Sequence, residues 1–153
     1  ITLIPGERVE TVDPEARAIR SASASTYTYG DLIWTAGGRP RRFPGAHVIR
    51  SLADVDALRA HLPDAHRILV IGGGYIGLEA ASVLTTLGKQ VTLTEAADRL
   101  LTRCSAEPLS RFLEAEHRSR GVDIRLGTPE IDHDTFDLVI AGIGINPNAE
   151  PLL

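Results

Sequence analysis

Apolar and polar positions follow two different patterns along the chain. Before residue 37 the apolar positions come in short alternating stretches, such as 9–12 and 27–29, which are separated by Pro-Gly and Asp-Pro dipeptides. This pattern predicts short strands joined by tight turns. A short apolar strand is predicted over 31–36, and the Gly-, Pro- and Arg-rich residues 37–50 are predicted to form a linker.

A helix is predicted directly after this linker. Ser51 is followed three positions later by Asp54, which is the spacing of a capping box. Apolar positions then recur at helical spacing, and Pro63 ends the helix. These apolar positions are Leu52, Val55, Leu58 and Leu62.

From residue 67 the pattern changes to longer, strongly apolar segments. The continuous apolar run 68–71 is typical of a strand that is buried on both faces. A glycine turn at 72–74 leads into a helix that ends at Gly88. The buried face of this helix is predicted to consist of Ile76, Ala80, Val83, Leu84 and Leu87.

Three more strands are predicted, over 91–95, 122–126 and 136–141. The helix between the first two is predicted to begin at the N-cap Ser105 and to end at Gly121. Its predicted buried stripe consists of Leu109, Phe112 and Leu113. Alternating strands and helices imply parallel pairing with helices on both faces. The sequence therefore predicts an α/β fold, a doubly wound parallel sheet of the Rossmann-like type.

Composition narrows the classes of protein and of function. The chain has 153 residues and a formal net charge of −4, which argues against a nucleic-acid-binding face. No apolar run reaches the roughly 18 residues of a membrane span, and no signal-peptide pattern is visible. The single cysteine, Cys104, excludes an internal disulfide. Because the chain contains no Met, we interpret it as a piece of a longer protein.

The glycine turn carries the main functional signal. Gly72, Gly74 and Gly77 fit the pattern G-x-G-x-x-G between an apolar strand and an amphipathic helix. The first glycine permits a sharp turn, the second lets a pyrophosphate approach the backbone, and the third lets the helix pack closely on the sheet. The helix N-terminus would offer its N–H groups and positive dipole end to the phosphates.

An acidic residue completes the dinucleotide pattern. Glu95 ends the next predicted strand, 23 residues after Gly72. A carboxylate there can accept hydrogen bonds from the adenosine ribose and would repel the 2′-phosphate of NADP. No Arg directly follows it, although Arg99 and Arg103 lie further along. The sequence therefore predicts NAD(H) in preference to NADP(H).

The segment Val70–Glu79 resembles the NAD-domain signature of FAD-dependent ferredoxin reductases. This is the putidaredoxin reductase and dioxygenase ferredoxin reductase group of the pyridine nucleotide–disulfide oxidoreductase superfamily. Segments 37–41, 116–125 and 137–148 are similar to that family in the same order. The resemblance implies an enzyme in which NADH reduces FAD by hydride transfer. The flavin then passes single electrons to a [2Fe-2S] ferredoxin that feeds an oxygenase.

The resemblance also implies roles for individual residues. The pyrophosphate would lie on the glycine turn, the adenosine ribose against Glu95, and the adenosine end near Arg103. Glu79 would contact the nicotinamide carboxamide, with Ile143 and Gly144 beside it, while Arg41 and the turn 35–37 would contact FAD. The complete set of implied cofactor-binding residues is Gly72, Gly73, Gly74, Tyr75, Ile76, Gly77, Glu79, Glu95, Arg103, Gly142, Ile143, Gly144 and Arg41.

By the same resemblance, three regions are expected. Residues 1–48 would be the end of a first FAD-domain segment with the linker, 49–148 the NAD domain, and 149–153 the start of the return to the FAD domain. Only 127–135 separates two strands between which the family inserts a β-meander of about twenty residues. Either this member is trimmed, or residues are missing from the sequence. The chain alone is expected to lack most of a flavin site and to be inactive.

Other functions stay open at this stage. A disulfide or peroxide reductase, or an NADH oxidase, of the same superfamily would carry its redox cysteine in the FAD domain, so Cys104 does not decide between them. A non-catalytic NAD-binding module is a further alternative. No catalytic residue and no metal site are assigned, because His133 between two aspartates is interpreted as an exposed loop. The partners expected are NADH and the ferredoxin, in the cytoplasm, without nucleic acid or membrane.

Overall fold

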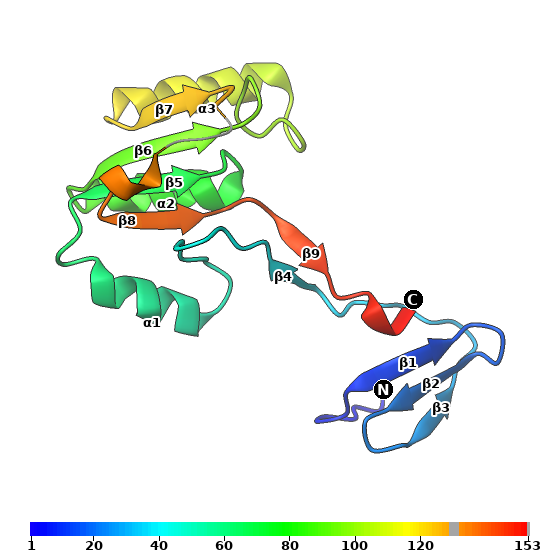
Figure 1. Ribbon diagram of the computed structural model, residues 1–153. Coiled ribbons are helices and arrows are strands. Elements are labelled where there is room, and N and C mark those ends of the chain that lie inside the picture. The colour runs from blue at the N-terminus through cyan, green and yellow to red at the C-terminus, as the bar shows by residue number, and fades with distance from the viewer. Residues whose placement is uncertain (129–131, 153) are drawn as a thin grey trace. The chain divides into compact units, whose positions relative to one another are not determined.

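A computed structural model describes residues 1–128 and 132–152 of the chain and divides it into two compact units (Figure 1). One unit consists of Ile1–Arg39 and Asn146–Leu153, and the other of Pro40–Ile145. The second unit is therefore inserted into the first. The chain leaves and re-enters the first unit through two strands that pair with each other, β4 (Gly38–Pro40) and β9 (Ile145–Pro147).

The first unit is built on a small antiparallel sheet. Strands β1 (Val9–Asp13), β2 (Ala18–Ser21) and β3 (Thr26–Thr28) follow one another as a meander, with an irregularity between Val9 and Thr11. The short 3₁₀ helix η2 (Glu150–Leu152) belongs to this unit and contacts β1. The prediction of short strands and turns in this region is confirmed. The strand predicted over 31–36 is wrong, because those residues are irregular and the strand lies at 38–40, where the chain pairs with β9.

Residues 31–37 are held by side-chain and backbone contacts in place of a strand ladder. The Trp34 indole N–H donates to the Asn148 carbonyl oxygen at 2.8 Å. The Asn148 amide donates to the Ala36 carbonyl oxygen at 3.0 Å, and its backbone N–H donates to the Gly37 carbonyl oxygen at 2.9 Å. These contacts supply the partners that backbone polar groups require when no neighbouring strand provides them.

The second unit contains a four-stranded sheet in the order β7-β6-β5-β8. All three pairings in it are parallel. Its strands are β5 (Arg67–Ile71), β6 (Gln90–Glu95), β7 (Asp123–Leu126) and β8 (Leu138–Ala141). The crossovers β5-β6 and β6-β7 run through the helices α2 (Tyr75–Thr86) and α3 (Glu107–Ser119), as parallel pairing requires. The predicted parallel α/β sheet of the Rossmann-like class is confirmed.

The core of this unit lies between the sheet and its helices. Ile68, Val70, Leu93 and Ile140 are fully buried at its centre. Helix α1 (Leu52–His61) contributes Leu58 to the same cluster. The predicted capping box of α1 is confirmed, because the Ser51 hydroxyl accepts from the Asp54 N–H while the Asp54 carboxylate accepts from the Ser51 N–H.

The predicted buried face of α2 is only partly correct. Ala80 and Leu84 are buried, but Ile76, Val83 and Leu87 are 46–58% exposed. The residues that face the core are Gly77, Leu78, Ala80, Ala81 and Leu84. The helix takes this orientation because Gly77 must face the glycine turn, and that contact fixes the rotation of α2 about its axis.

The prediction for α3 is wrong in its cap and only partly correct in its buried stripe, of which Leu113 alone packs against the core. The helix has Ala106 at its N-cap, without a side-chain cap, and the Ser105 hydroxyl bonds to the Ala106 carbonyl oxygen instead. Leu109 and Phe112 are 49% and 63% exposed, whereas Ser110 is 1% exposed. A small hydroxyl side chain on the inner face lets α3 approach the loop after β6, where Ser110 has hydrogen-bonding partners.

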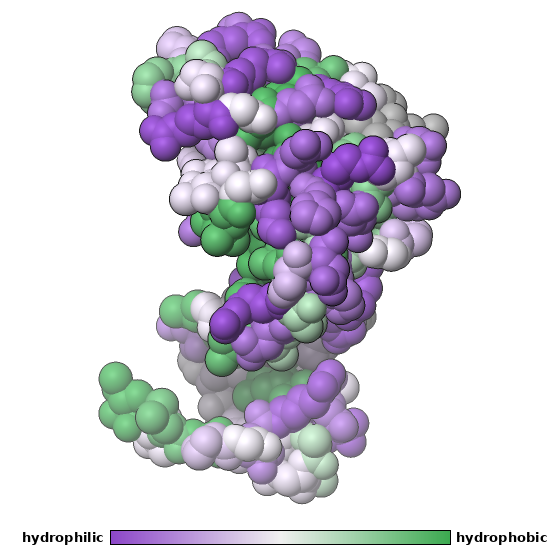
Figure 2. All heavy atoms as spheres, turned by 90° about the vertical axis from the view of Figure 1, so that its left-hand side faces the viewer, coloured by the Kyte–Doolittle hydropathy of each residue, from purple (hydrophilic) through white to green (hydrophobic). Residues whose placement is uncertain are grey.

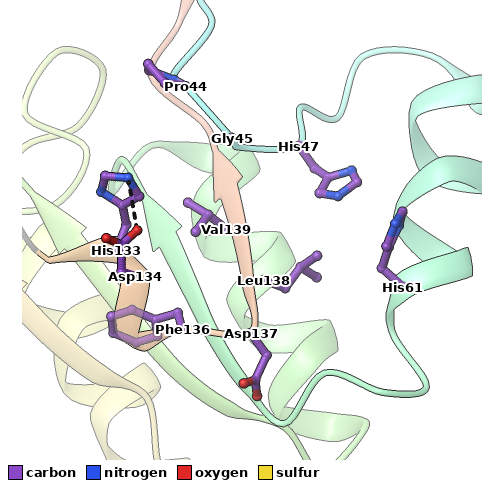
Figure 3. Close-up of a pocket in the computed structure, with 10 residues that line it drawn as sticks. All are labelled: Pro44, Gly45, His47, His61, His133, Asp134, Phe136, Asp137, Leu138 and Val139. Carbon is purple, nitrogen blue, oxygen red and sulfur yellow. Dashed lines mark ion pairs between the residues drawn. The ribbon is translucent and has the colours of Figure 1, made fainter.

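A pocket of about 540 Å³ lies where β8 begins (Figure 3). The His47 backbone lies beside β8. Its N–H donates to the Val139 carbonyl oxygen and its carbonyl oxygen accepts from the Ala141 N–H, both at 2.8 Å. The His47 and His61 rings lie 5.1 Å apart on one side of the pocket. Since the strands are parallel, this pocket lies at the opposite end of the sheet from the glycine turn.

The surface that faces the viewer in Figure 2 is the side on which the parallel strands begin. Hydrophilic residues predominate in its upper part, which is formed by the second unit. Within the described parts of the chain, no helix is both long and apolar enough to cross a bilayer.

We predict that acid weakens the second unit through His47. Burial, and to a smaller extent the neighbouring His61, lower the pKa of His47 below its ordinary value of 6.5. The unfolded chain therefore binds the proton more readily than the folded chain, so this contribution to the free energy of unfolding is complete above about pH 6.5 and is lost as the pH falls below it. Urea unfolding at pH 7.5, 6.5 and 5.5 measures the loss.

Replacement of the imidazole provides the control for this prediction. His47→Gln should flatten the pH dependence between 5.5 and 7.5, whereas His66→Gln, at an exposed position, should leave it unchanged. The lowered pKa of Asp137, caused by the Arg67 and His66 backbone N–H groups, acts only near and below pH 3.8 and does not overlap this range. An identical profile for His47→Gln and the unmodified chain would contradict the assignment.

Candidate nucleotide-binding site

The glycine turn begins where β5 ends. Gly72 has a φ of +105°, a conformation that L side chains rarely adopt, and its N–H donates to the Thr94 carbonyl oxygen at 2.8 Å. A Cβ atom on Gly72 would lie 2.5 Å from the Gly142 carbonyl oxygen. Both the backbone conformation and the lack of space therefore require glycine at this position.

Helix α2 starts directly on this turn. A Cβ atom on Gly77 would overlap the Gly72 carbonyl oxygen, so only a glycine lets the helix approach this closely. The Gly142 N–H donates to the Ile71 carbonyl oxygen at 2.7 Å, which brings the end of β8 to the same point. Gly72, Gly77 and Gly142 are therefore brought together, as the sequence predicted for the glycine turn and the helix.

The second glycine of the motif, in contrast, has free space beside it. Gly74 is the N-cap of α2, has no side chain to cap the helix, and a Cβ atom there would meet nothing within 4 Å. Tyr75 and Ile76 in the first turn are 61% and 46% exposed. The open backbone at this helix N-terminus fits an anionic group, because N–H groups and the positive end of the helix dipole face the same space.

The predicted acidic residue lies against the glycine turn. Glu95 ends β6, half-buried, and its Oε2 accepts a hydrogen bond from the Gly73 N–H at 2.7 Å. Its Oε1 accepts from the Ala97 N–H at 2.9 Å. Each carboxylate oxygen has a further lone pair, so the group can also accept from a ligand hydroxyl. The carboxylate and the turn thus form one constellation.

A second contact to the turn was not anticipated from the sequence. The Leu101 N–H donates to the Gly73 carbonyl oxygen at 3.0 Å, so the loop after β6 also holds the turn. Leu100 and Leu101 are 0% and 3% exposed. The apolar pair that follows the acidic residue was the available signal for this buried loop.

The remaining predicted residues lie around this constellation. Glu79 is exposed on α2, and Arg103 is exposed on the loop after β6 with no hydrogen-bond or ion-pair partner among the described residues. The Arg41 N–H donates to the carbonyl oxygen of Gly144, which is exposed and has a φ of +98°. Ile143 is half-buried between Gly142 and Gly144. Arg41 thus pairs with the 142–144 segment.

No metal centre is formed by the described residues. In residues 1–128 and 132–152, no group of three or more His, Cys, Asp or Glu side chains is arranged to hold an ion. Cys104 is exposed.

The fold is a parallel α/β domain, and its glycine turn is a candidate nucleotide site. The family model described as pyridine nucleotide-disulphide oxidoreductase matches residues 1–152, and the chain belongs to this family. It is 47% identical to a ferredoxin–NAD(P)⁺ reductase of a Sphingomonas species, covering 97% of this chain and 42% of that protein. It is 36% identical to a putidaredoxin reductase of Pseudomonas putida, and the alignment covers 98% of this chain and 42% of that protein.

The chain thus spans less than half the length of these relatives. The alignment with the Sphingomonas protein runs over 172 residues although this chain has 153, so that relative has additional residues within the aligned region. The connection at 127–135, which is shorter than the β-meander expected from the family, includes residues that the structure does not describe.

Solved structures of the same family share the fold. The chain matches the covalent putidaredoxin reductase–putidaredoxin complex with a TM-score of 0.76 and 35% identity, over 96% of this chain and 42% of that one. An NADH-bound, water-forming NADH oxidase of Lactobacillus brevis matches with a TM-score of 0.75 and 26% identity, over 95% and 38%. Its engineered, NADPH-bound variant matches with a TM-score of 0.73 and 27% identity, over 95% and 38%.

We predict that Gly72→Ala destabilises the second unit strongly. The added methyl group would require strained backbone at positive φ and would collide with the Gly142 carbonyl oxygen. We expect a loss of about 2–5 kcal/mol in the free energy of unfolding, measured by urea denaturation. Gly74→Ala, with open space and a φ of −84°, is the matched control and should change stability by no more than about 1 kcal/mol. Equal losses for both variants would contradict the packing argument.

Proposed function

We propose that this chain binds NADH at the glycine turn. The observation that carries the proposal is the joint geometry of the open N-terminus of α2 at Gly74 and the Glu95 carboxylate, whose Oε2 lies 2.7 Å from the Gly73 nitrogen. The N–H groups of the first turn of α2 would bind the pyrophosphate, and Glu95 would accept hydrogen bonds from the adenosine ribose. Arg103, an exposed cation on the adjacent loop, would contact the adenosine end.

We propose that the chain discriminates against NADPH through charge. The Glu95 carboxylate would repel a 2′-phosphate on the ribose that it binds. The engineered NADPH-bound oxidase carries five substitutions, which include a glycine and an aspartate that lie 18 positions apart. Gly77 and Glu95 have the same separation, so this spacing supports the assignment of Glu95 as the residue that selects the nucleotide.

The nicotinamide would lie on the side of the turn where β8 ends. There Gly142, Ile143 and Gly144 would line the ring, and Glu79 would accept a hydrogen bond from the carboxamide. NADH supplies the hydride for the reaction, and this segment would hold the nicotinamide so that it faces the flavin. The φ of +98° at Gly144 favours glycine, so no side chain would cover the ring at that position.

The intact protein is proposed to be an FAD-dependent ferredoxin reductase. NADH would reduce FAD, and electrons would then pass singly to a [2Fe-2S] ferredoxin that feeds an oxygenase. From this chain, Arg41 and the turn 35–37 would contact FAD. Asn148 holds that turn in place, and its Oδ1 is buried without a hydrogen-bonding partner within residues 1–128 and 132–152. A group outside the described residues can therefore satisfy it.

Two other functions share the nucleotide site. An NADH oxidase or a disulfide reductase would use the same NADH geometry with different chemistry in the FAD domain. The 47% identity to a ferredoxin reductase, against 26% to the NADH oxidase, favours the ferredoxin reductase. A non-catalytic NAD-binding module would lack flavin in the intact protein. Because NADH is an intracellular reductant, we propose a cytoplasmic location.

We predict that the chain binds NADH more tightly than NADPH and that Glu95→Gln reduces the difference. Glutamine keeps one oxygen for the Gly73 N–H but loses the charge, and hydrogen bonds to charged groups contribute about 1.5–3 kcal/mol. NADH affinity should therefore fall about 10- to 100-fold, measured by isothermal titration calorimetry. Glu10→Gln, an exposed carboxylate on β1, is the control. Absence of NADH binding, or tighter binding of NADPH, would refute the proposed function of this chain.

A second prediction concerns the open space at Gly74. A methyl group there would occupy the position through which a pyrophosphate approaches the backbone, while the fold itself has room for it. Gly74→Ala should therefore lower NADH affinity about tenfold or more and leave urea unfolding nearly unchanged. Gly30→Ala, at a glycine with equally open surroundings in the first unit, should leave the affinity unchanged. Unchanged NADH affinity of Gly74→Ala would place the pyrophosphate elsewhere.

A further inference from the structure

The Arg99 side chain makes three hydrogen bonds within the loop after β6 and to α3. Its Nη1 donates to the Ser105 carbonyl oxygen at 3.0 Å and to the Ser110 hydroxyl at 3.1 Å. Its Nη2 donates to the Thr102 carbonyl oxygen at 3.2 Å. The planar guanidinium, with donors in fixed directions, suits this set of acceptors, whereas a single ammonium group does not. Arg99 therefore links the beginning of the loop to its end at Ser105 and also links the loop to α3 through Ser110.

The contacts continue from Arg99 to the glycine turn. The Ser110 hydroxyl, which accepts from Arg99, donates in turn to the Leu100 carbonyl oxygen, and both residues are at most 1% exposed. The next residue, Leu101, donates its N–H to the Gly73 carbonyl oxygen at 3.0 Å. The Gly73 N–H is bound by Glu95. An unbroken series of hydrogen bonds and one peptide unit thus joins α3 to the turn.

Leu101 shows that this loop is held under strain. Its φ of +53° lies in the left-handed region, which is unfavourable for a residue other than glycine. Such a conformation persists only where surrounding contacts determine it. The Leu101 carbonyl oxygen accepts from the Cys104 and Ser105 N–H groups, and this turn is held in place by the contacts of Arg99 with Ser105 and of Ser110 with Leu100. Without them the loop can relax, and the Leu101 N–H would then move away from Gly73.

We propose that Arg99 is a positioning residue for the nucleotide and makes no contact with it. It holds the loop so that Leu101 fixes the Gly73 peptide, and with it the glycine turn and the loop that carries Arg103. This inference rests on the proposed binding of NADH. It also assigns the two arginines after Glu95 different roles, because the Arg99 donors are directed at protein oxygens while Arg103 is free of protein partners within the described residues.

Amide hydrogen exchange, followed by NMR on the 153-residue chain without nucleotide, tests the positioning role directly. In Arg99→Gln, exchange at the Leu101 and Gly73 amides should become about tenfold faster, because each amide hydrogen bond opens more often. The matched control is Arg111→Gln, which removes the same charge from the exposed side of α3, where Arg111 pairs with Glu107 and Glu114. Unchanged exchange at both amides in Arg99→Gln would overturn the inference.

Nucleotide affinity tests the functional consequence. Calorimetry should show that Arg99→Gln weakens NADH and NADPH by the same factor, about tenfold, since displacement of binding groups by a fraction of 1 Å is sufficient for such a loss. A selective loss of NADPH affinity would mean that Arg99 binds the 2′-phosphate and would overturn the inference. If the unmodified chain binds neither nucleotide, the proposed function fails, and the nucleotide part of this inference fails with it.

Two further variants keep the test decisive if Arg99→Gln does not fold. Ser110→Ala removes only the hydroxyl between Arg99 and Leu100, and it should raise exchange at Leu101 in the same direction. Arg99→Lys keeps the charge and can reach part of the acceptor set, so both exchange and NADH affinity should lie between those of the glutamine variant and the unmodified chain. Wild-type behaviour of Ser110→Ala in both measurements would contradict the proposed series of contacts.

Discussion

Three backbone segments meet where β5 ends, with no side chain between them. The carbonyl oxygen of Gly72 lies against the first turn of α2 at Gly77, and the Gly142 carbonyl oxygen lies against Gly72 from the other side. Neither contact tolerates a Cβ atom, so the close approach fixes the position of the helix, the turn and the end of β8 together. The place of the α2 N-terminus, where we propose that the pyrophosphate binds, is a consequence of this close approach.

The close contact between Gly72 and Gly77 also explains why the predicted buried face of α2 is only partly correct. Periodicity alone placed Ile76 and Val83 in the core, because they recur at helical spacing with Ala80 and Leu84. The requirement that Gly77 face Gly72 rotates α2 and leaves Ile76 and Val83 exposed. The strands of the parallel sheet and the helices between them were predictable because long apolar runs and the glycines that follow each helix, Gly88 and Gly121, are local signals. The rotation of a helix is not local, since it is determined by contacts that are distant in sequence.

In the candidate site, likewise, the sequence predicts the residues with local requirements but not a contact between distant segments. Gly72, Gly74, Gly77 and Glu95 could be recognised from spacing, because each has a local conformational or chemical requirement. The contact from Leu101 to Gly73 could not be recognised, since it depends on a loop that Ser110 of α3 holds through the Leu100 carbonyl oxygen. Serine at an inner helix position resembles a surface residue in sequence. Only its two hydrogen-bonding partners reveal that it is part of the packing.

The insertion of the second unit has a consequence for protein engineering. Its two ends lie next to each other, where β4 pairs with β9 and the Arg41 N–H donates to the Gly144 carbonyl oxygen at 2.9 Å. A segment whose ends already meet can be cut out, or placed in a loop of another protein, with little loss of chain entropy. Residues 40–145 therefore have the close ends that suit insertion into a loop of another protein. A short peptide between residues 39 and 146 would then rejoin the two parts of the first unit.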